Sequence, residues 1–341
     1  MSVLGPVSIL APVLAASFLL MIVLAGALHL ARRKSGQIEQ AHPPQGQFIT
    51  VGNCQLHYRQ TGDVTKPALL VLHGAASNLE DQYFTLADTF VDQHVIWLDR
   101  PGLGWSERPA SRRWSPRHEA ALIVQFLDAL TITQATIIGH SWGGAISMRL
   151  AIDHPARVSG LVLLAPALSA WIGDAAWFNK ATFWPLIGPV ISRLVVPLTG
   201  AQSLATGAIK ACHPEPVPDD YLKASALTLL LRPSNWDANA ADMRDVNHHL
   251  EDQEGMYETL PHPTIIIAGI KDGVLWTKYH GVAVSRRMKN AELRIIEGAG
   301  HNPHHHHQEA ILDAVITVQS RAIPMSGGEL PKQMKLASSP A

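Results

Sequence analysis

The fold of this 341-residue chain is decided by the stretch IGHSWGG at residues 138–144. A short apolar run comes directly before it, and a sequence of helical character follows it. The stretch matches the pattern G-x-S-x-G, in which glycines flank a serine at a sharp turn from strand to helix, because side chains at the flanking positions would clash there. In this context the pattern predicts that Ser141 is exposed at the start of a helix, where free N–H groups favour developing negative charge.

The chain on either side of this stretch alternates between apolar runs and segments of helical length. The runs are continuous and rich in Val, Ile and Leu, as in strands buried on both faces of a sheet. One helical segment, residues 115–130, has Ser115 as a suitable N-cap and Pro116 as a suitable first helical residue. The alternation predicts an α/β fold with a mostly parallel sheet flanked by helices. The predicted strands are residues 69–72, 95–98, 136–138, 161–164, 264–268 and 293–296.

One long region interrupts this alternation, between Ala165 and Pro263. It has no clear strand, and its Trp and Phe residues are scattered through helix-like sequence that Pro and Gly interrupt. We therefore expect a helical cap, at about residues 166–262, inserted over the sheet. After the last helical segment, residues 322–341 are rich in Ser, Pro, Gly and Lys, which predicts a flexible tail.

The N-terminal segment is strongly apolar, with no Asp, Glu, Lys or Arg from Ser2 to Ala31. A helix needs about 20 such residues to span a bilayer. We expect a transmembrane anchor at residues 5–31 and a polar linker at residues 32–47. A buried core helix is one alternative, but such helices usually keep a polar face. A cleaved secretory signal is the other, but signals begin with basic residues and have an apolar region of about 7–15 residues.

Charge and cysteine content limit the location and the partners. Three basic residues, Arg32 to Lys34, follow the predicted span, and such flanks tend to stay in the cytoplasm, so we expect the rest of the chain there. The 27 Lys and Arg residues balance 28 Asp and Glu, which argues against nucleic acid as a partner. Cys54 and Cys212 lack the spacing of a zinc site or a disulfide framework, so we expect no metal cofactor and a reducing compartment.

The order of the motifs resembles that of the α/β-hydrolase fold family over residues 48–321. Besides the serine turn, LHGAAS at residues 72–77 resembles the HG turn of the family, and LDRPGLGWS at residues 98–106 resembles its D-x-P-G-x-G-x-S loop. The family's catalytic residues follow the order Ser, acid, His. The resemblance implies that Ser141 is the nucleophile, whereas Asp99 and Arg100 brace the loop in which they lie.

The resemblance also implies which residues act with the serine. His301 in EGAGHNP resembles the family's G-x-G-H loop, and Asp272 in IIAGIKDG resembles its G-x-x-D turn, so we expect a base and an orienting acid there. Asp242 and Asp245 are weaker alternatives for the acid, because no predicted strand precedes them. The two backbone N–H groups that would bind the oxyanion map onto Ala75 and Trp142.

The chain has 18 histidines, and the run from His304 to His307 competes with His301 for the role of base. Successive residues of a helix point in different directions, so this run would not form one metal site. We interpret it as a solvated start of the last helix, and a role in metal binding or pH response remains the alternative.

A serine at the turn argues against epoxide hydrolases and haloalkane dehalogenases, which use a carboxylate there. We expect a membrane-anchored serine hydrolase that cleaves carboxylic esters of apolar acyl groups, similar to carboxylesterases or monoacylglycerol lipases, because the cap is apolar and the chain is tethered at a bilayer. The apolar stretch at residues 184–198 would lie at the membrane interface or pack the cap onto the sheet. No cofactor is implied, and the sequence does not indicate the oligomeric state.

Three alternatives to this function remain. A peptidase or amidase is less favoured, because proline iminopeptidase relatives have D-Q-R-G where this chain has Asp99-Arg100-Pro101-Gly102. A thioesterase or acyltransferase would use the same acyl-enzyme. A non-catalytic membrane-tethered binding protein is least favoured, because the sequence keeps every element of the catalytic set.

Overall fold

The structure, a computed structural model, describes residues 7–108, 114–171 and 176–322. Within these residues eight strands form one sheet in the order β1-β2-β4-β3-β5-β6-β7-β8. Neighbours from β4 to β8 pair in parallel, whereas β1 and β2 pair antiparallel at one edge, so the predicted mostly parallel sheet is confirmed. The strands are β1 (Gln47–Val51), β2 (Cys54–Thr61), β3 (Ala68–Leu72), β4 (His94–Leu98), β5 (Ala135–His140), β6 (Val158–Leu164), β7 (Thr264–Gly269) and β8 (Ala291–Ile296).

The predicted apolar runs lie inside the six strands from β3 to β8. Strands β1 and β2 were not predicted, because they mix polar and apolar residues and contain no continuous apolar run. In the centre of the sheet, Leu72 of β3 lies beside Gly139 of β5, and His140 lies beside Leu164 of β6. The carboxyl ends of these three parallel strands are therefore level, and the loops that follow them meet at one edge.

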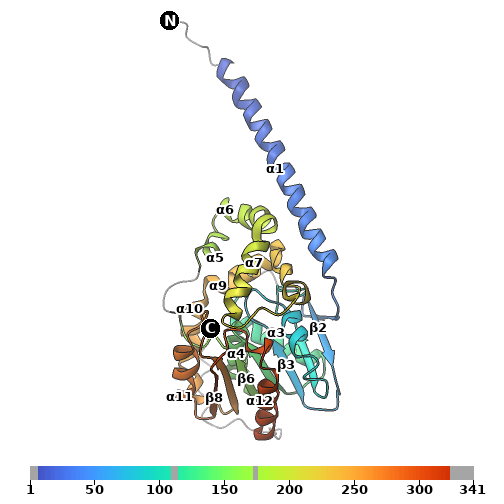
Figure 1. The fold of residues 1–341 in the computed structure, drawn as a ribbon. Coiled ribbons are helices and arrows are strands. Elements are labelled where there is room, and N and C mark those ends of the chain that lie inside the picture. Colours follow the sequence, from blue (N-terminus) through green and yellow to red (C-terminus); the bar gives the residue numbers. More distant parts are fainter. Residues whose placement is uncertain (1–6, 109–113, 172–175, 323–341) are drawn as a thin grey trace, which may run out of the picture.

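Helices cover both faces of the sheet (Figure 1). Alternate residues of each strand point to opposite faces, so two hydrophobic clusters form, one on each side. Helix α3 begins at Pro116 after Ser115, as predicted. One face packs against α3 (Pro116–Ala129), α4 (Trp142–Asp153) and α11 (Val284–Arg287), and the other against α2 (Leu79–Leu86) and α12 (Gln308–Arg321).

The region between β6 and β7 is helical in its described residues and contains no strand there. We call this region the cap. It lies at the end of the body beside the N-terminal helix (Figure 1). Its main elements are α5 (Trp177–Ala181), α6 (Ile187–Val190), the π-helical turn η2 (Ile191–Val195), α7 (Val196–Cys212), α8 (Tyr221–Ala224), α9 (Pro233–Arg244) and α10 (Val246–Glu254).

Helix α1 (Val7–Ala41) is a single helix of 35 residues that projects from the body (Figure 1). By length and composition, its segment Pro12–Ala41 is long enough and apolar enough to cross a membrane. The helix does not end with the apolar run: residues 32–41, expected to form a linker, continue it. Ala, Arg, Lys, Gln and Glu favour helix there, and the chain leaves the helix just before Pro43. Residues 5–6 of the expected anchor and residues 323–341 of the expected tail lie outside the described residues.

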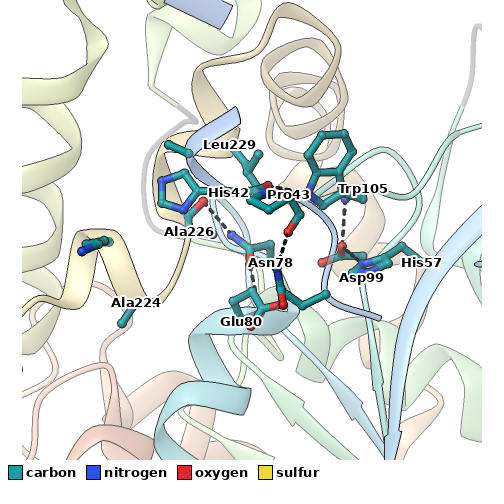
Figure 2. Close-up of a pocket in the computed structure, with 13 residues that line it drawn as sticks. His42, Pro43, His57, Asn78, Glu80, Asp99, Trp105, Ala224, Ala226 and Leu229 are labelled. Atoms are coloured by element: carbon teal, nitrogen blue, oxygen red, sulfur yellow. Dashed lines mark hydrogen bonds and ion pairs between the residues drawn. The ribbon is translucent and has the colours of Figure 1, made fainter. Parts of the chain in front are cut away.

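The C-terminal end of α1 contacts the body around a pocket of about 170 Å³ (Figure 2). The indole N–H of Trp105 donates to the carbonyl of His42 at 3.0 Å, and the backbone N–H of Trp105 donates to the Asp99 carboxylate at 2.8 Å. The same carboxylate lies 2.7 Å from Nδ1 of His57. Asp99 thus braces the loop, as the resemblance implies, and the pocket contains none of the predicted catalytic residues.

Candidate active site

Ser141 occupies a strained turn between β5 and α4. Its backbone has φ 50° and ψ −117°, a region that non-glycine residues rarely adopt. Its N–H donates to the carbonyl of Leu164 at 2.9 Å, which ties the turn to β6. A Cβ at Gly143 would lie 2.2 Å from the carbonyl oxygen of Leu72, and one at Gly139 would lie 2.3 Å from Oγ of Ser147. Both flanking positions therefore require glycine, which is the physical content of the G-x-S-x-G pattern.

The structure brings Ser141, His301 and Asp272 together from three separate loops. Nε2 of His301 lies 3.0 Å from Oγ of Ser141, and Nδ1 lies 2.8 Å from Oδ2 of Asp272. The other carboxylate oxygen of Asp272 accepts the backbone N–H groups of Val274 and Leu275, both at 2.8 Å. With Nδ1 donating to the carboxylate, Nε2 is left to accept the serine proton. This geometry can activate a hydroxyl nucleophile.

The two alternative acids, Asp242 and Asp245, form ion pairs with arginines. Asp242 binds the guanidinium groups of Arg100 and Arg108, each at 2.8 Å, and Asp245 pairs with the arginine that precedes it. The buried Arg100 also binds Glu119 at 2.7 Å. Burial alone would lower the pKa of Arg100, but Glu119 and Asp242 outweigh it and raise that pKa. Arg100 is therefore a fixed cation that joins the sheet to the cap.

The predicted oxyanion donors lie beside the serine. A Cβ at Gly74 would lie 3.1 Å from Cβ of Ser141, so the turn that carries Ala75 touches the nucleophile. Trp142 is the first residue of α4, where a backbone N–H has no intrahelical acceptor. Among the described residues, the backbone N–H groups of Ala75 and Trp142 donate no hydrogen bond to the protein other than the regular bonds within helices and strands. The turn is fixed from the cap, because the N–H of Ala76 donates to Oδ1 of Asn239 at 2.6 Å.

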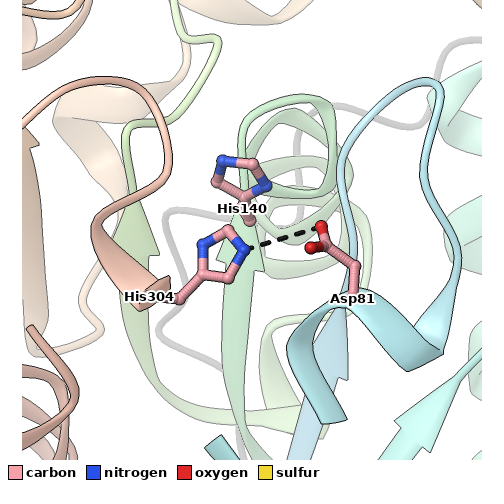
Figure 3. A group of neighbouring side chains, drawn as sticks. All are labelled: Asp81, His140 and His304. Atoms are coloured by element: carbon pink, nitrogen blue, oxygen red, sulfur yellow. Dashed lines mark ion pairs between the residues drawn. The ribbon is translucent and has the colours of Figure 1, made fainter. Parts of the chain in front are cut away.

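The prediction of a solvated histidine run is wrong for two of its four residues. His304 and His305 are buried, because the 3-10 turn η6 (Pro303–His305) folds them under the site and α12 starts only at Gln308. The ring of His304 lies beside both Asp81 and His140, the residue before the nucleophile (Figure 3). Burial lowers the pKa of His304 to about 4, so this imidazole is neutral at neutral pH. The sequence carries no sign of this burial.

Asp81, His140 and His304 offer ligand atoms that all lie within 4.8 Å of one another. Nε2 of His140 contacts the carbonyl of His301 at 3.0 Å, whereas Nδ1 of His140 and both ring nitrogens of His304 have no hydrogen-bond partner among the described residues. The Asp81 carboxylate is also engaged, with Oγ of Ser77 at 2.9 Å, the hydroxyl of Tyr221 at 3.0 Å and Nε2 of His305 at 3.2 Å. We therefore interpret the group as a polar support beneath the His301 loop.

Two further buried histidines hold loops at this edge as hydrogen-bond acceptors. Nδ1 of His280 accepts the N–H groups of Leu168 and Ser169, both at 3.2 Å, in the loop that follows β6. Nε2 of His73 accepts the N–H of Arg100 at 2.9 Å. Burial lowers the pKa of each imidazole to about 4. Protonation of either ring would remove the acceptor of buried backbone N–H groups.

These histidines predict an acid-sensitive fold. Between an unfolded pKa of about 6.5 and a folded pKa of about 4, the unfolded chain binds protons that the native state excludes, so stability falls as the pH falls through this window. At pH 5 the loss is about 2 kcal/mol for one such group. In His280→Asn, whose Oδ1 takes the place of Nδ1 as an acceptor that does not titrate, thermal unfolding should shift less between pH 7.5 and 5. An unchanged pH slope, equal to that of the exposed control His118→Asn, would contradict this role.

Proteins of known structure and curated relatives share this architecture. A putative lipase from Acinetobacter baumannii AYE is similar with a TM-score of 0.65 and 22% identity over 85% of this chain and 96% of that one. A membrane phospholipase A has a TM-score of 0.60 and 20% identity over 91% of this chain and 98% of that one. Both likenesses concern the fold alone.

A curated relative comes from Pseudomonas putida and is named the dihydrolipoyllysine-residue acetyltransferase component of an acetoin cleaving system. It is 27% identical over 273 residues, which are 78% of this chain and 67% of that protein. The model of the alpha/beta hydrolase fold matches residues 67–308, more than half of the chain. The chain therefore belongs to the α/β-hydrolase fold family.

Proposed function

We propose that this protein is a membrane-anchored serine hydrolase that cleaves carboxylic esters of apolar acyl groups. The observation that carries the proposal is the chain of contacts from Oγ of Ser141 to Nε2 of His301, at 3.0 Å, and from Nδ1 to the Asp272 carboxylate, at 2.8 Å. A nucleophile, a base and an orienting acid in hydrogen-bond reach form a complete unit for acyl transfer to serine.

The reaction proceeds in two halves. His301 takes the hydroxyl proton as Oγ of Ser141 attacks the ester carbonyl carbon, and the negative charge on the carbonyl oxygen is stabilised by the N–H groups of Ala75 and Trp142. The intermediate then expels the alcohol, which receives the proton from His301, and leaves an acyl group on the serine. Water, deprotonated by His301, then attacks the acyl carbon. The bond from Oγ to that carbon breaks, His301 returns the proton to Oγ, and the acid is released. Asp272 stabilises the imidazolium at each step.

The preference for apolar acyl groups rests on the apolar character of the cap and of α1. The cap supplies exposed Trp, Phe, Leu and Ile side chains, and α1 provides an apolar helix of spanning length. The lipase and the phospholipase named above share the fold, which supports an ester substrate without fixing it. The acetyltransferase relative keeps acyl transfer open as an alternative, since the acyl-enzyme is common to both reactions.

We propose further that α1 is an uncleaved anchor and that the body lies on the cytoplasmic side. Arg32, Arg33 and Lys34 lie at the body end of the apolar segment, where the positive-inside tendency favours the cytoplasm. Contact between α1 and the body also supports retention of α1 in the mature protein. The guanidinium group of Arg232 lies 3.3 Å from the carboxylate of Glu39, which belongs to the same helix.

Removal of the catalytic groups should abolish turnover without unfolding the protein. We expect Ser141→Ala and His301→Ala each to lower kcat for p-nitrophenyl butyrate by about 10⁴-fold to 10⁶-fold, and Asp272→Asn by about 10⁴-fold. Asp245→Asn, a half-exposed residue of the cap, serves as the control and should retain activity. Activity is compared per folded protein, determined by circular dichroism. If Asp245→Asn lost activity and Asp272→Asn kept it, the acid assignment would be wrong.

An apolar acyl site predicts a rising response to chain length. Each buried methylene contributes about 0.8 kcal/mol, so kcat/KM should rise up to about fourfold per methylene from p-nitrophenyl acetate to the octanoate. The matching p-nitroanilides and thioesters are measured beside the esters. A flat profile would contradict an apolar acyl pocket, and faster cleavage of the anilides would indicate an amidase instead.

The proposed topology can be measured by protease protection. In intact spheroplasts the body should resist added protease, and it should be digested once the membrane is opened. A full-length product on a gel is expected, because α1 is retained. Digestion of the body in intact spheroplasts would place it on the opposite side, and a mature chain lacking about 31 residues would identify α1 as a cleaved signal.

A further inference from the structure

We propose that residues 177–195, which comprise α5, α6 and η2 and which we call the cap tip, form a second membrane contact. In this arrangement the cap tip lies in the headgroup and upper acyl region of the bilayer that α1 crosses. The inference rests on the proposed membrane anchoring, and its consequence is that an amphiphilic lipid ester enters the site from the bilayer.

The cap tip exposes large apolar side chains at high density. Leu186 is 87% exposed and Trp177 is 70% exposed, although both are among the most apolar residue types. Single exposed apolar residues are common on soluble proteins, whereas a contiguous group indicates a contact with a membrane or a partner. The exposed set comprises Trp177, Phe178, Phe183, Trp184, Leu186, Ile187, Val190 and Val195.

The charge of this segment favours a lipid surface. From residue 176 to the end of α7 at Cys212 the sequence contains Lys180, Arg193 and Lys210 and no Asp or Glu. An apolar surface with aromatic residues and only basic charges is typical of segments that lie at the membrane interface. A segment with this charge is attracted to an anionic lipid surface.

The position of α1 identifies the bilayer as the occupant. The hydrocarbon core is about 30 Å thick, which corresponds to about 20 residues of helix at ~1.5 Å each. Residues 12–26 of α1 are all exposed, and from residue 12 onward the first side chain that is buried is Ala31. The contact of α1 with the body therefore begins at about the point where the helix has become long enough to cross the hydrocarbon core. The elements of the body that contact α1 are chiefly α7 and η2.

Figure 1 shows α6 at the end of the body nearest the apolar half of α1. A membrane that surrounds this apolar half therefore meets the cap tip before any other part of the body. Because the exposed apolar surfaces of α1 and of the cap tip belong to neighbouring elements, one bilayer covers both. A protein partner would cover the cap tip alone. It would not explain why the exposed apolar surface of the cap tip adjoins that of α1.

The cap tip is linked to the chemistry by a single helix. Helix α7 begins directly after η2 and ends at Cys212, and the carbonyl of Ala211 accepts the backbone N–H of His301 at 2.9 Å. A Cβ at Gly300 would lie 2.3 Å from the carbonyl of His213, so this helix end and the histidine loop are in close contact. Seating of the cap tip at the bilayer thus fixes the position of the His301 loop relative to the lipid surface through α7.

The contact can be tested on the full-length chain in nanodiscs of phosphatidylcholine and phosphatidylglycerol. An environment-sensitive fluorophore is attached to Leu186→Cys, and Val91→Cys, 68% exposed in the loop before β4, is the matched control. Cys54 and Cys212 are buried and do not compete for the label. We expect blue-shifted emission at residue 186, quenched by doxyl-labelled lipid, and water-like emission at residue 91.

A water-like, unquenched probe at residue 186 would overturn the proposal. Blue-shifted emission without quenching by lipid would also overturn it, because the cap tip would then be covered by protein. Neither reading depends on catalysis, so a chain that cleaves no ester still gives a decision on the contact.

A second variant connects the contact to function. Leu186→Glu should lower hydrolysis of a long-chain monoacylglycerol in the bilayer by about tenfold and leave hydrolysis of p-nitrophenyl acetate in solution unchanged. Ile316→Glu, a half-exposed residue of α12, is the control for an added charge. Equal loss on both substrates would indicate a damaged fold. Equal rates of Leu186→Glu and the wild type on the bilayer substrate would contradict entry from the bilayer.

Discussion

The backbone of Ser141, at φ 50° and ψ −117°, is the constraint on which the site depends. A residue held in such a conformation costs about 1–3 kcal/mol and persists only where its surroundings determine it. Here the N–H of Ser141 is bound to Leu164 and its carbonyl accepts the N–H of Ala167 at 3.0 Å, while Gly143 lets α4 approach β3. The turn therefore points Oγ away from the sheet and toward His301. The HG turn, the acid turn and the cap all converge on this atom.

Buried ion pairs hold the cap in place over that turn. Arg100 follows β4, Glu119 lies on α3 and Asp242 lies on α9 of the cap, and all three are buried in one network. Loss of one partner from such a network leaves an uncompensated charge and costs about 3–5 kcal/mol. The cap residue Asn239 fixes the turn that carries Ala75, so the same cap helix that carries Asp242 also shapes the predicted oxyanion site.

The parts that the sequence could predict are those set by local chemistry. Continuous apolar runs identify β3 to β8, and glycines around Ser141 identify the turn, because each signal lies within a few residues. Strands β1 and β2 carry no such run, since β1 is largely exposed at the edge of the sheet. The burial of His304 depends on Asp81 and His140, which are far away in the sequence. The continuation of α1 to Ala41 rests on residues that favour helix, a local signal that the polar composition of this segment outweighed in the prediction of a linker.

The central claim is that Ser141 is a nucleophile activated within the folded protein. The most direct measurement is reaction of the native full-length chain with a fluorophosphonate, followed by mass spectrometry of its peptides. One adduct per chain is expected, located on Ser141, and no adduct is expected when the chain is unfolded before labelling. A folded chain that gains no adduct, or that gains it on another residue, would contradict the account.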